Sequence, residues 1–194
     1  MVDIMEKVRI IIGGSGGQGI LTAGKVLSYA ALYQNMNVTC LPSYGAEMRG
    51  GYVYCTIVIY SAEDIVSPVS AETDIGVFMD ENSSRMLRGY LKKNAFVILN
   101  SSLIKSFNSS VGNITKIEAS EIAERLGSIK TASMVATGAI GYIIDHFFFP
   151  YTMKGLYYGI EQVFSSREHI EMSKKSLETG WKILEDGKKR DRKD

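Results

Sequence analysis

The segment from Lys7 to Gly19 constrains the fold of this chain more than any other. It begins with an apolar, β-type run, Lys7-Val-Arg-Ile-Ile-Ile12, and continues into Gly13-Gly-Ser-Gly-Gly-Gln-Gly19, in which five of seven residues are glycine. Apolar residues then recur at helical spacing from Ile20 to Gln34. A strand, a tight turn and a helix start are therefore expected in succession. Such a turn brings backbone N–H groups close to an anion, and the helix dipole adds a favourable field, so the segment predicts an anion-binding loop.

Two nucleotide-binding patterns can be compared with this loop. The spacing Gly14-x-Gly16-x-x-Gly19 fits the dinucleotide fingerprint. That fingerprint continues with an acidic residue about 20 positions later, but here the second expected strand is followed by Pro42-Ser-Tyr44, without an acid. The phosphate-loop motif needs Lys after its last glycine, where this chain has Ile20. Dinucleotide binding and purely structural glycines, required for helix–strand packing, both stay open as alternatives.

Apolar periodicity along the remaining chain predicts an α/β fold. Because a helix connects the first two strands, we expect them to run parallel. The helix over 134–148 is apolar nearly all round and carries Gly138 and Gly141, which predicts close burial against another element. We therefore expect an open, mainly parallel sheet with helices on both faces, a Rossmann-like variant whose C-terminal third is helical. Further strands are expected over 37–41, 52–60, 74–79, 96–99 and 114–117, and further helices over 83–91, 120–126, 155–164 and 170–184.

Composition is typical of one globular domain. The 194 residues are long enough for a single core, which we place over residues 1–187, followed by a charged flexible tail over 188–194. The net charge of +1 excludes the basic footprint of a nucleic-acid-binding protein. No signal-peptide pattern is present, and no apolar run reaches the roughly 18 residues of a membrane span. A cytoplasmic location is expected.

The chain contains only two cysteines, Cys40 and Cys55, each inside a strand-like run. We expect both to be small, buried hydrophobic side chains, and a disulfide is not expected in a reducing compartment. Two cysteines cannot supply the four thiolates of an iron–sulfur cluster, so no such cluster is expected within this chain. His146 lies beside a run of phenylalanines, where packing is favoured over a ligand role, and no metal site is expected.

A second polar segment, Pro42–Gly51, follows the second expected strand. It combines Ser43, Tyr44, Glu47 and Arg49 within a glycine-bounded loop. The carboxyl ends of parallel strands meet at one edge of a sheet, so this loop is expected to lie beside the glycine loop. Arg49 can face a phosphate or carboxylate with two hydrogen bonds. The alternative is a Glu47–Arg49 surface ion pair in a structural turn.

Two motifs together resemble the gamma subunit of the 2-oxoacid:ferredoxin oxidoreductases. They are Gly14-x-Gly-Gly-Gln-Gly-x-x-Thr-Ala-Gly24 and Pro42-Ser-Tyr-Gly-x-Glu-Met-Arg-Gly-Gly51, and the resemblance extends to Ser67-Pro68 and Asp74-Ile75. The second motif is most similar to the 2-oxoglutarate branch. The resemblance implies a multi-subunit enzyme that decarboxylates a 2-oxoacid on thiamine diphosphate, passes electrons through iron–sulfur clusters to ferredoxin or a similar acceptor, and forms an acyl-CoA.

The same resemblance implies alpha, beta and ferredoxin-like delta partner subunits. This chain lacks the Gly-Asp-Gly signature for thiamine diphosphate and magnesium, and it lacks a cysteine cluster. Those cofactors are therefore expected in the partner chains, and the isolated chain is expected to be inactive, with no catalytic residue of its own. A purely structural assembly subunit and a free-standing NAD-dependent dehydrogenase remain alternatives. This chain is expected to help bind coenzyme A and to close over the active site of the partner subunits. The residues expected to contact coenzyme A are Gly14, Gly16, Gly17, Gln18, Gly19, Thr22, Ser43, Tyr44, Glu47 and Arg49.

Overall fold

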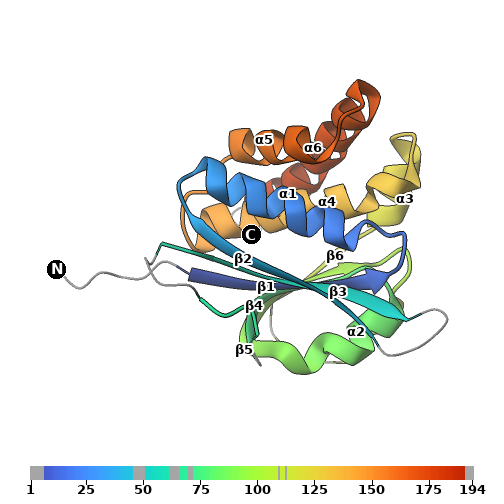
Figure 1. The fold of residues 1–194 in the computed structure, drawn as a ribbon. Coiled ribbons are helices and arrows are strands. Elements are labelled where there is room, and N and C mark those ends of the chain that lie inside the picture. Colours follow the sequence, from blue (N-terminus) through green and yellow to red (C-terminus); the bar gives the residue numbers. More distant parts are fainter. Residues whose placement is uncertain are drawn as a thin grey trace.

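The computed structural model describes residues 7–45, 51–61, 66–69, 72–108, 110–111 and 113–190. Its centre is a six-stranded sheet with the strand order β2-β3-β1-β4-β5-β6 (Figure 1). The strands are β1 (Lys7–Ser15), β2 (Asn37–Tyr44), β3 (Tyr52–Tyr60), β4 (Thr73–Phe78), β5 (Leu91–Asn100) and β6 (Asn113–Ile117). The helices are α1 (Ile20–Tyr33), α2 (Glu81–Leu87), α3 (Ala119–Arg125), α4 (Ala132–Phe147), α5 (Met153–Val163) and α6 (Arg167–Arg190), with short 3-10 helices η1 (Arg88–Tyr90) and η2 (Ile129–Thr131).

The sheet is open and mainly parallel, as expected. Strands β1, β4, β5 and β6 are neighbours and run parallel, whereas β3 is antiparallel to both β1 and β2. Strand β2 therefore runs in the direction of β1, as the helical connection predicted. The two are nevertheless not neighbours, because β3 lies between them. The connection from β2 to β3 is short, which favours an antiparallel hairpin, and β3 pairs with β1 along its other edge.

Strand β2 extends three residues beyond its expected end and includes Pro42, Ser43 and Tyr44. The expectation that a loop begins at Pro42 was wrong. Proline has no backbone N–H, but β2 is an edge strand, and an edge strand tolerates that loss. Tyr44 pairs with Val53, and Val53 pairs with Gly14, so the end of β2 lies level with the start of the glycine loop.

Helices cover the two faces of the sheet unequally. On one face α1 and α4 pack between the sheet and an outer layer of α5 and α6, and on the other face α2 is the principal helix (Figure 1). Every residue of α4 from Ala132 to Ile144 is buried, because the helix has neighbours on nearly all sides. The expected helices on both faces and the helical C-terminal third are confirmed.

Helices α4 and α6 approach each other closely through two glycines. A Cβ at Gly138 would lie 1.9 Å from the backbone oxygen of Leu177, and a Cβ at Gly180 would lie 1.8 Å from that of Val135. Both neighbours are backbone atoms, which cannot move aside without separating the helices. The close burial expected for the glycines of this helix is confirmed, and its cause is the crossing of α4 by α6.

We expect Gly180→Ala to lower the free energy of unfolding by about 1–3 kcal/mol, the usual range for an overpacked core. Urea unfolding of the purified chain measures the change. Gly187→Ala in the same helix is the matched control, because a Cβ at Gly187 meets no atom within 4 Å. The control should be neutral or stabilise by up to about 1 kcal/mol, since alanine favours helix more than glycine. Equal effects of the two substitutions would contradict the proposed close approach.

Some element boundaries differ from those expected. Helix α2 begins at Glu81 rather than near Ser83, because the Asp80 carboxylate caps it by accepting a hydrogen bond from the Ser83 N–H at 2.8 Å. Helix α6 continues to Arg190, so the expected boundary of the tail after residue 187 falls inside a helix. Within the described ranges, no helix combines the length and apolar character needed to cross a bilayer.

Candidate functional site

The glycine loop joins β1 to α1 and requires glycine at two positions. Gly17 has a φ of 87° and Gly19 a φ of 75°, both in the left-handed region that side chains disfavour. Gly19 is also the N-cap of α1 and supplies no side-chain cap. Gly16 and Gly17 are exposed, and a Cβ at either would meet no atom within 4 Å. The loop therefore presents its backbone to open space at the positive end of a helix.

Two side chains fix the shape of this loop from inside. The Gln18 Oε1 accepts a hydrogen bond from the Ser15 N–H at 2.7 Å. The Ser15 hydroxyl in turn donates to the Asp80 carboxylate at 2.6 Å. Gly14 lies beneath the loop, where a Cβ would be 2.5 Å from the Gln18 Oε1. Gln18 therefore shapes the loop through its Oε1 and through its own N–H, which donates to the Ser15 backbone oxygen at 3.2 Å, and Gly14 leaves room for that side chain.

The loop leaves several backbone donors free. The first intrahelical hydrogen bond of α1 runs from the Ala23 N–H to the Gly19 oxygen. The N–H groups of Gly16, Gly17 and Gly19 have no acceptor in the part of the chain that the structure describes. The first turn of any α-helix adds further unsatisfied N–H groups. Together they form a donor set suited to a phosphate or another oxyanion.

A cavity of about 340 Å³ lies between the loop and the end of β2, and we call it the strand-side cavity. Tyr44 lines it opposite the glycines, with 70% of its side chain exposed, and Thr22 lines its helical wall. Tyr44 reaches this position because β2 and β1 end level with each other on either side of β3. The full lining is Ser15, Gly16, Gly17, Gly19, Ile20, Leu21, Thr22, Tyr44 and Val53.

A second cavity, of about 250 Å³, lies on the other side of the same loop, and we call it the helix-side cavity. Gly17, Gly19 and Thr22 line both cavities, so the loop forms the partition between them. The remaining wall comes from η2 and the residue before it, from the start of α4, from the α5–α6 connection and from the first turns of α6. Its other lining residues are Ser128, Lys130, Thr131, Ser133, Met134, Phe164, His169, Met172 and Ser173.

The helix-side cavity brings a second helix N-terminus to the loop. Thr131 is the N-cap of α4 and makes no side-chain cap, because its hydroxyl donates instead to the Ser128 oxygen at 2.9 Å. Ser133 is 2% exposed, and its hydroxyl has no hydrogen-bond partner among the described residues. A Cβ at Gly19 would lie 2.5 Å from that hydroxyl oxygen. Lys130 also lines this cavity, so two helix N-termini and one basic residue border it.

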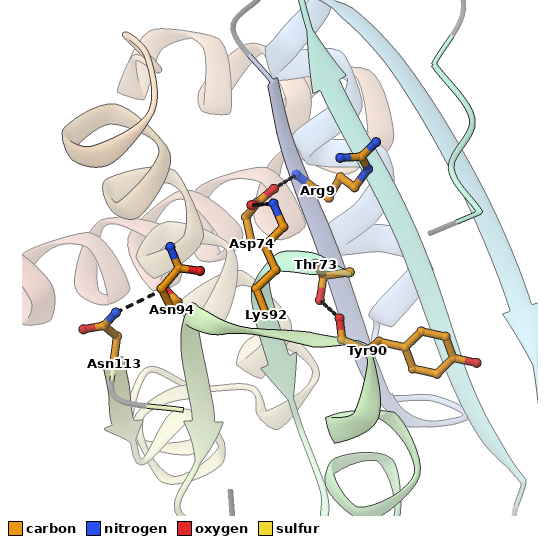
Figure 2. Close-up of polar contacts among 7 residues, drawn as sticks. All are labelled: Arg9, Thr73, Asp74, Tyr90, Lys92, Asn94 and Asn113. Atoms are coloured by element: carbon orange, nitrogen blue, oxygen red, sulfur yellow. Dashed lines mark hydrogen bonds and ion pairs between the residues drawn. The ribbon is translucent and has the colours of Figure 1, made fainter. Parts of the chain in front are cut away.

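A different cluster of polar residues lies at the other end of the parallel strands from the glycine loop, where β4 and β5 begin (Figure 2). Asp74 accepts a hydrogen bond from the Arg9 N–H at 2.8 Å and pairs with the Lys92 ammonium at 2.5 Å. The Thr73 hydroxyl donates a hydrogen bond to the Tyr90 backbone oxygen at 2.9 Å. The Arg9 guanidinium points away from Asp74 (Figure 2). These contacts join the strand starts, and the Asp74 charge is already paired, so this group is structural.

Residues 9–183 match the family model described as pyruvate ferredoxin/flavodoxin oxidoreductase. The chain belongs to this family. A family relative, the ketoisovalerate oxidoreductase subunit VorA of Methanothermobacter thermautotrophicus, is 31% identical over 90% of this chain and 36% of its own length. This chain thus spans about a third of VorA. The 2-oxoglutarate synthase subunit KorC of Methanocaldococcus jannaschii is 33% identical over 72% of this chain and 75% of its own length.

Solved structures of the oxidoreductase family share the fold. A keto/oxoacid ferredoxin oxidoreductase gamma subunit from Geobacter sulfurreducens superposes with a TM-score of 0.78 and 20% identity, covering 90% of this chain and 96% of that one. A second match is the 2-oxoglutarate:ferredoxin oxidoreductase from Magnetococcus marinus, solved with 2-oxoglutarate, coenzyme A and succinyl-CoA bound. It superposes with a TM-score of 0.76 and 18% identity, covering 90% of this chain and 30% of that one. The family resemblance inferred from the two sequence motifs is confirmed by the family model, and the fold is that of a gamma subunit of such an oxidoreductase.

The structure brings together only some of the residues singled out in this family member's sequence. Gly16, Gly17, Gly19, Thr22 and Tyr44 converge on the strand-side cavity. Ser43 does not, because alternate residues of a strand face opposite sides of the sheet, and Ser43 pairs with Tyr54 on the α2 side. Glu47 and Arg49 lie outside the described residues.

Sequence reasoning missed Lys130, Ser133 and His169, because more than 100 residues separate them from the glycine loop. One local signal was available: Ser128-Ile-Lys-Thr131 precedes an apolar helical run, and such polar residues mark a helix start. Asp80 was also missed, although an acid directly after a buried strand is a familiar cap for the next helix. Among the described residues, no group of three or more His, Cys, Asp or Glu is arranged to hold a metal ion.

Proposed function

We propose that this chain is the gamma-type subunit of a thiamine-diphosphate-dependent 2-oxoacid oxidoreductase, and that its glycine loop binds coenzyme A. The observation that carries the proposal is the partition of two cavities by free backbone N–H groups at the start of α1. Coenzyme A carries a diphosphate and a 3′-phosphate, and backbone donors at a helix N-terminus suit both groups. The diphosphate lies against Gly16, Gly17 and Gly19 in this proposal, with Lys130 as the neighbouring cation.

One solved structure of similar fold supports this assignment. The Magnetococcus marinus enzyme of similar fold was solved with coenzyme A and succinyl-CoA bound, and its matched chain is about three times as long as the part that superposes. The present chain has only two cysteines, too few for a four-thiolate cluster. We therefore assign thiamine diphosphate, magnesium and the iron–sulfur clusters to alpha, beta and ferredoxin-like delta partner chains. In that arrangement the reducing equivalents leave through the partners to ferredoxin or a similar acceptor.

For the substrate we propose 2-oxoglutarate, with succinyl-CoA as product. The support is the segment Ser43–Gly51, which resembles the 2-oxoglutarate branch, together with the relative KorC, named as a 2-oxoglutarate synthase subunit. The relative VorA is named for ketoisovalerate, so family membership alone does not choose the oxoacid. The free-standing dehydrogenase is the weaker alternative, because β2 ends at Tyr44 without the acidic residue that grips a dinucleotide ribose.

Substitution of Lys130 by alanine tests the phosphate site. We expect the apparent KM for coenzyme A of the assembled enzyme to rise about three- to tenfold, as the loss of one charge-assisted contact predicts. The kcat at saturating coenzyme A should stay unchanged, because in this proposal Lys130 faces a phosphate group, which takes no part in the chemical step. Initial rates of acyl-CoA formation at varied coenzyme A measure both constants.

The matched control is Lys154→Ala, which removes an exposed charge of the same kind near the opposite end of α1, where a Cβ at Gly155 would lie 3.1 Å from the Ala30 backbone oxygen. The control should leave the KM for coenzyme A unchanged. If Lys130→Ala and Lys154→Ala behave alike, the helix-side cavity does not hold a phosphate. If Lys130→Ala impairs assembly while the KM of the remaining complex is normal, the structural assembly alternative is favoured.

A further inference from the structure

The two cysteines of this chain meet between α1 and the edge of the sheet. The Sγ atoms of Cys40 on β2 and Cys55 on β3 lie 3.2 Å apart, and both thiols are free. Gly24 of α1 faces them, and a Cβ there would lie 2.7 Å from the Cys55 Sγ. The absence of a side chain at position 24 therefore leaves room for the two sulfurs. The expectation that both cysteines are merely buried hydrophobic residues was wrong, because Cys40 is exposed.

The two thiols differ in exposure and in proton affinity. Cys55 is 1% exposed, whereas Cys40 is open to solvent at the sheet edge. A hydrogen bond from the Cys55 thiol lowers the pKa of Cys40 to about 7; burial opposes the shift, while the Ser28 hydroxyl and the Lys25 ammonium assist it. The same hydrogen bond, burial and the neighbouring Cys40 charge raise the pKa of the Cys55 thiol well above its usual range. Above neutral pH, the thiol of the solvent-exposed residue Cys40 is therefore largely a thiolate, beside a protonated partner.

We propose that Cys40 and Cys55 form a reversible disulfide, in which Cys40 reacts first with a peroxide-class oxidant and Cys55 resolves the product. The Cys40 thiolate attacks one peroxide oxygen and breaks the O–O bond, giving a sulfenic acid and a hydroxide that takes up a proton to form water. The Cys55 sulfur then attacks the Cys40 sulfur, and the sulfenic hydroxide leaves with the Cys55 proton as a second water. Two thiols are oxidised and one hydrogen peroxide is reduced to two waters.

The surrounding backbone permits this bond and favours its reversal. A disulfide bond is about 2.05 Å long, so the sulfurs must approach by about 1.1 Å from their separation of 3.2 Å. Among the described strands β2 has one neighbour, β3, so a shift of β2 at the sheet edge breaks no second strand pairing. Cys40 pairs with Ile57 and Cys55 pairs with Pro42, which makes the cysteines diagonal neighbours. Diagonal Cα atoms lie about 7–8 Å apart, beyond the usual disulfide range of about 4.4–6.8 Å. Strained, exposed disulfides are readily reduced by dithiols, so the bond is reversible rather than structural.

Oxidation of the purified full chain tests the proposal independently of coenzyme A binding. The reduced chain is treated anaerobically with one equivalent of hydrogen peroxide, denatured, alkylated and analysed by peptide mass spectrometry. We expect a peptide pair linked through Cys40 and Cys55, which dithiothreitol returns to two alkylatable thiols. Recovery of Cys40 as a sulfinic acid with Cys55 still free would overturn the proposal, as would two unmodified thiols.

Two variants test the order of reaction. Cys55→Ala should stop at the Cys40 sulfenic acid, which dimedone traps, because no resolving thiol remains. Cys40→Ser should slow peroxide consumption about tenfold or more, since a buried thiol of high pKa is a poor nucleophile. The alkylation rate of Cys40 should have its midpoint near pH 7 in the native chain and about one unit or more higher in Cys55→Ala. An unchanged midpoint, or peroxide consumption that does not need Cys40, would contradict the assigned roles.

Discussion

Gly16→Val is expected to raise the apparent KM for coenzyme A about tenfold or more, a loss of about 1.4 kcal/mol of binding free energy. A Cβ at Gly16 would meet no atom within 4 Å, and Gly16 is not among the residues with positive φ. The variant should therefore fold and assemble normally. The added side chain occupies the open space in which we place the ligand diphosphate, so its effect should fall on binding alone. Initial rates of the assembled enzyme at varied coenzyme A measure it.

Gly89→Val is the control for this substitution, because a Cβ at Gly89 also meets no atom within 4 Å and the residue lies in η1, away from both cavities. We expect its KM for coenzyme A to equal that of the native enzyme. A purely structural glycine loop predicts the same normal value for Gly16→Val. Equal constants for the two variants would therefore remove the glycine loop from the coenzyme A site.

A large difference in kcat/KM is also expected between oxoacid substrates. We expect the assembled enzyme to use 2-oxoglutarate with a kcat/KM about a hundredfold or more above that for pyruvate. The distal carboxylate of 2-oxoglutarate requires a cation, and a site that buries this cation rejects a substrate without the carboxylate, because the cation is then left unpaired. Acyl-CoA formation from each oxoacid at subsaturating concentration gives the ratio.

The relative VorA makes 2-ketoisovalerate the most informative competitor. Equal or higher efficiency with that substrate, or with pyruvate, would contradict the substrate proposal and leave family membership intact. Arg49→Ala separates the two tasks that this guanidinium can perform. A rise in the KM for 2-oxoglutarate alone would assign Arg49 to the distal carboxylate, whereas a rise in the KM for coenzyme A alone would assign it to a phosphate.

Sequence patterns predicted the strand, turn and helix that form from residues close together along the chain. The run Lys7–Ile12, the glycines after it and the helical spacing from Ile20 fix a strand, a turn and a helix, and all three are present. The insertion of β3 between β1 and β2 was not predicted, because strand order depends on pairing between distant segments. The end of β2 was misplaced because Pro42 is usually a strand breaker, and its tolerance here depends on the edge position of β2.

The sequence predicted the glycine loop of the candidate site but not the residues of η2 and α4 that line the helix-side cavity. The glycines and Tyr44 converge because the ends of β1 and β2 lie level. Ser43 was grouped with Tyr44 although adjacent residues of a strand face opposite sides, and that error followed from placing both in a loop. Lys130 and Ser133 belong to a helix start and to no ligand-binding motif, and the packing of α4 beside α1 brings them to the glycines.

The most direct test of the coenzyme A proposal is an experimental structure of the assembled complex with coenzyme A bound. We predict diphosphate oxygens within about 3 Å of the backbone nitrogens of Gly16, Gly17 or Gly19, the usual length of such a hydrogen bond. We further predict Tyr44 beside the bound molecule and the Lys130 ammonium near a phosphate. Coenzyme A bound elsewhere in the complex, with the glycine loop making no contact to it, would contradict the central claim.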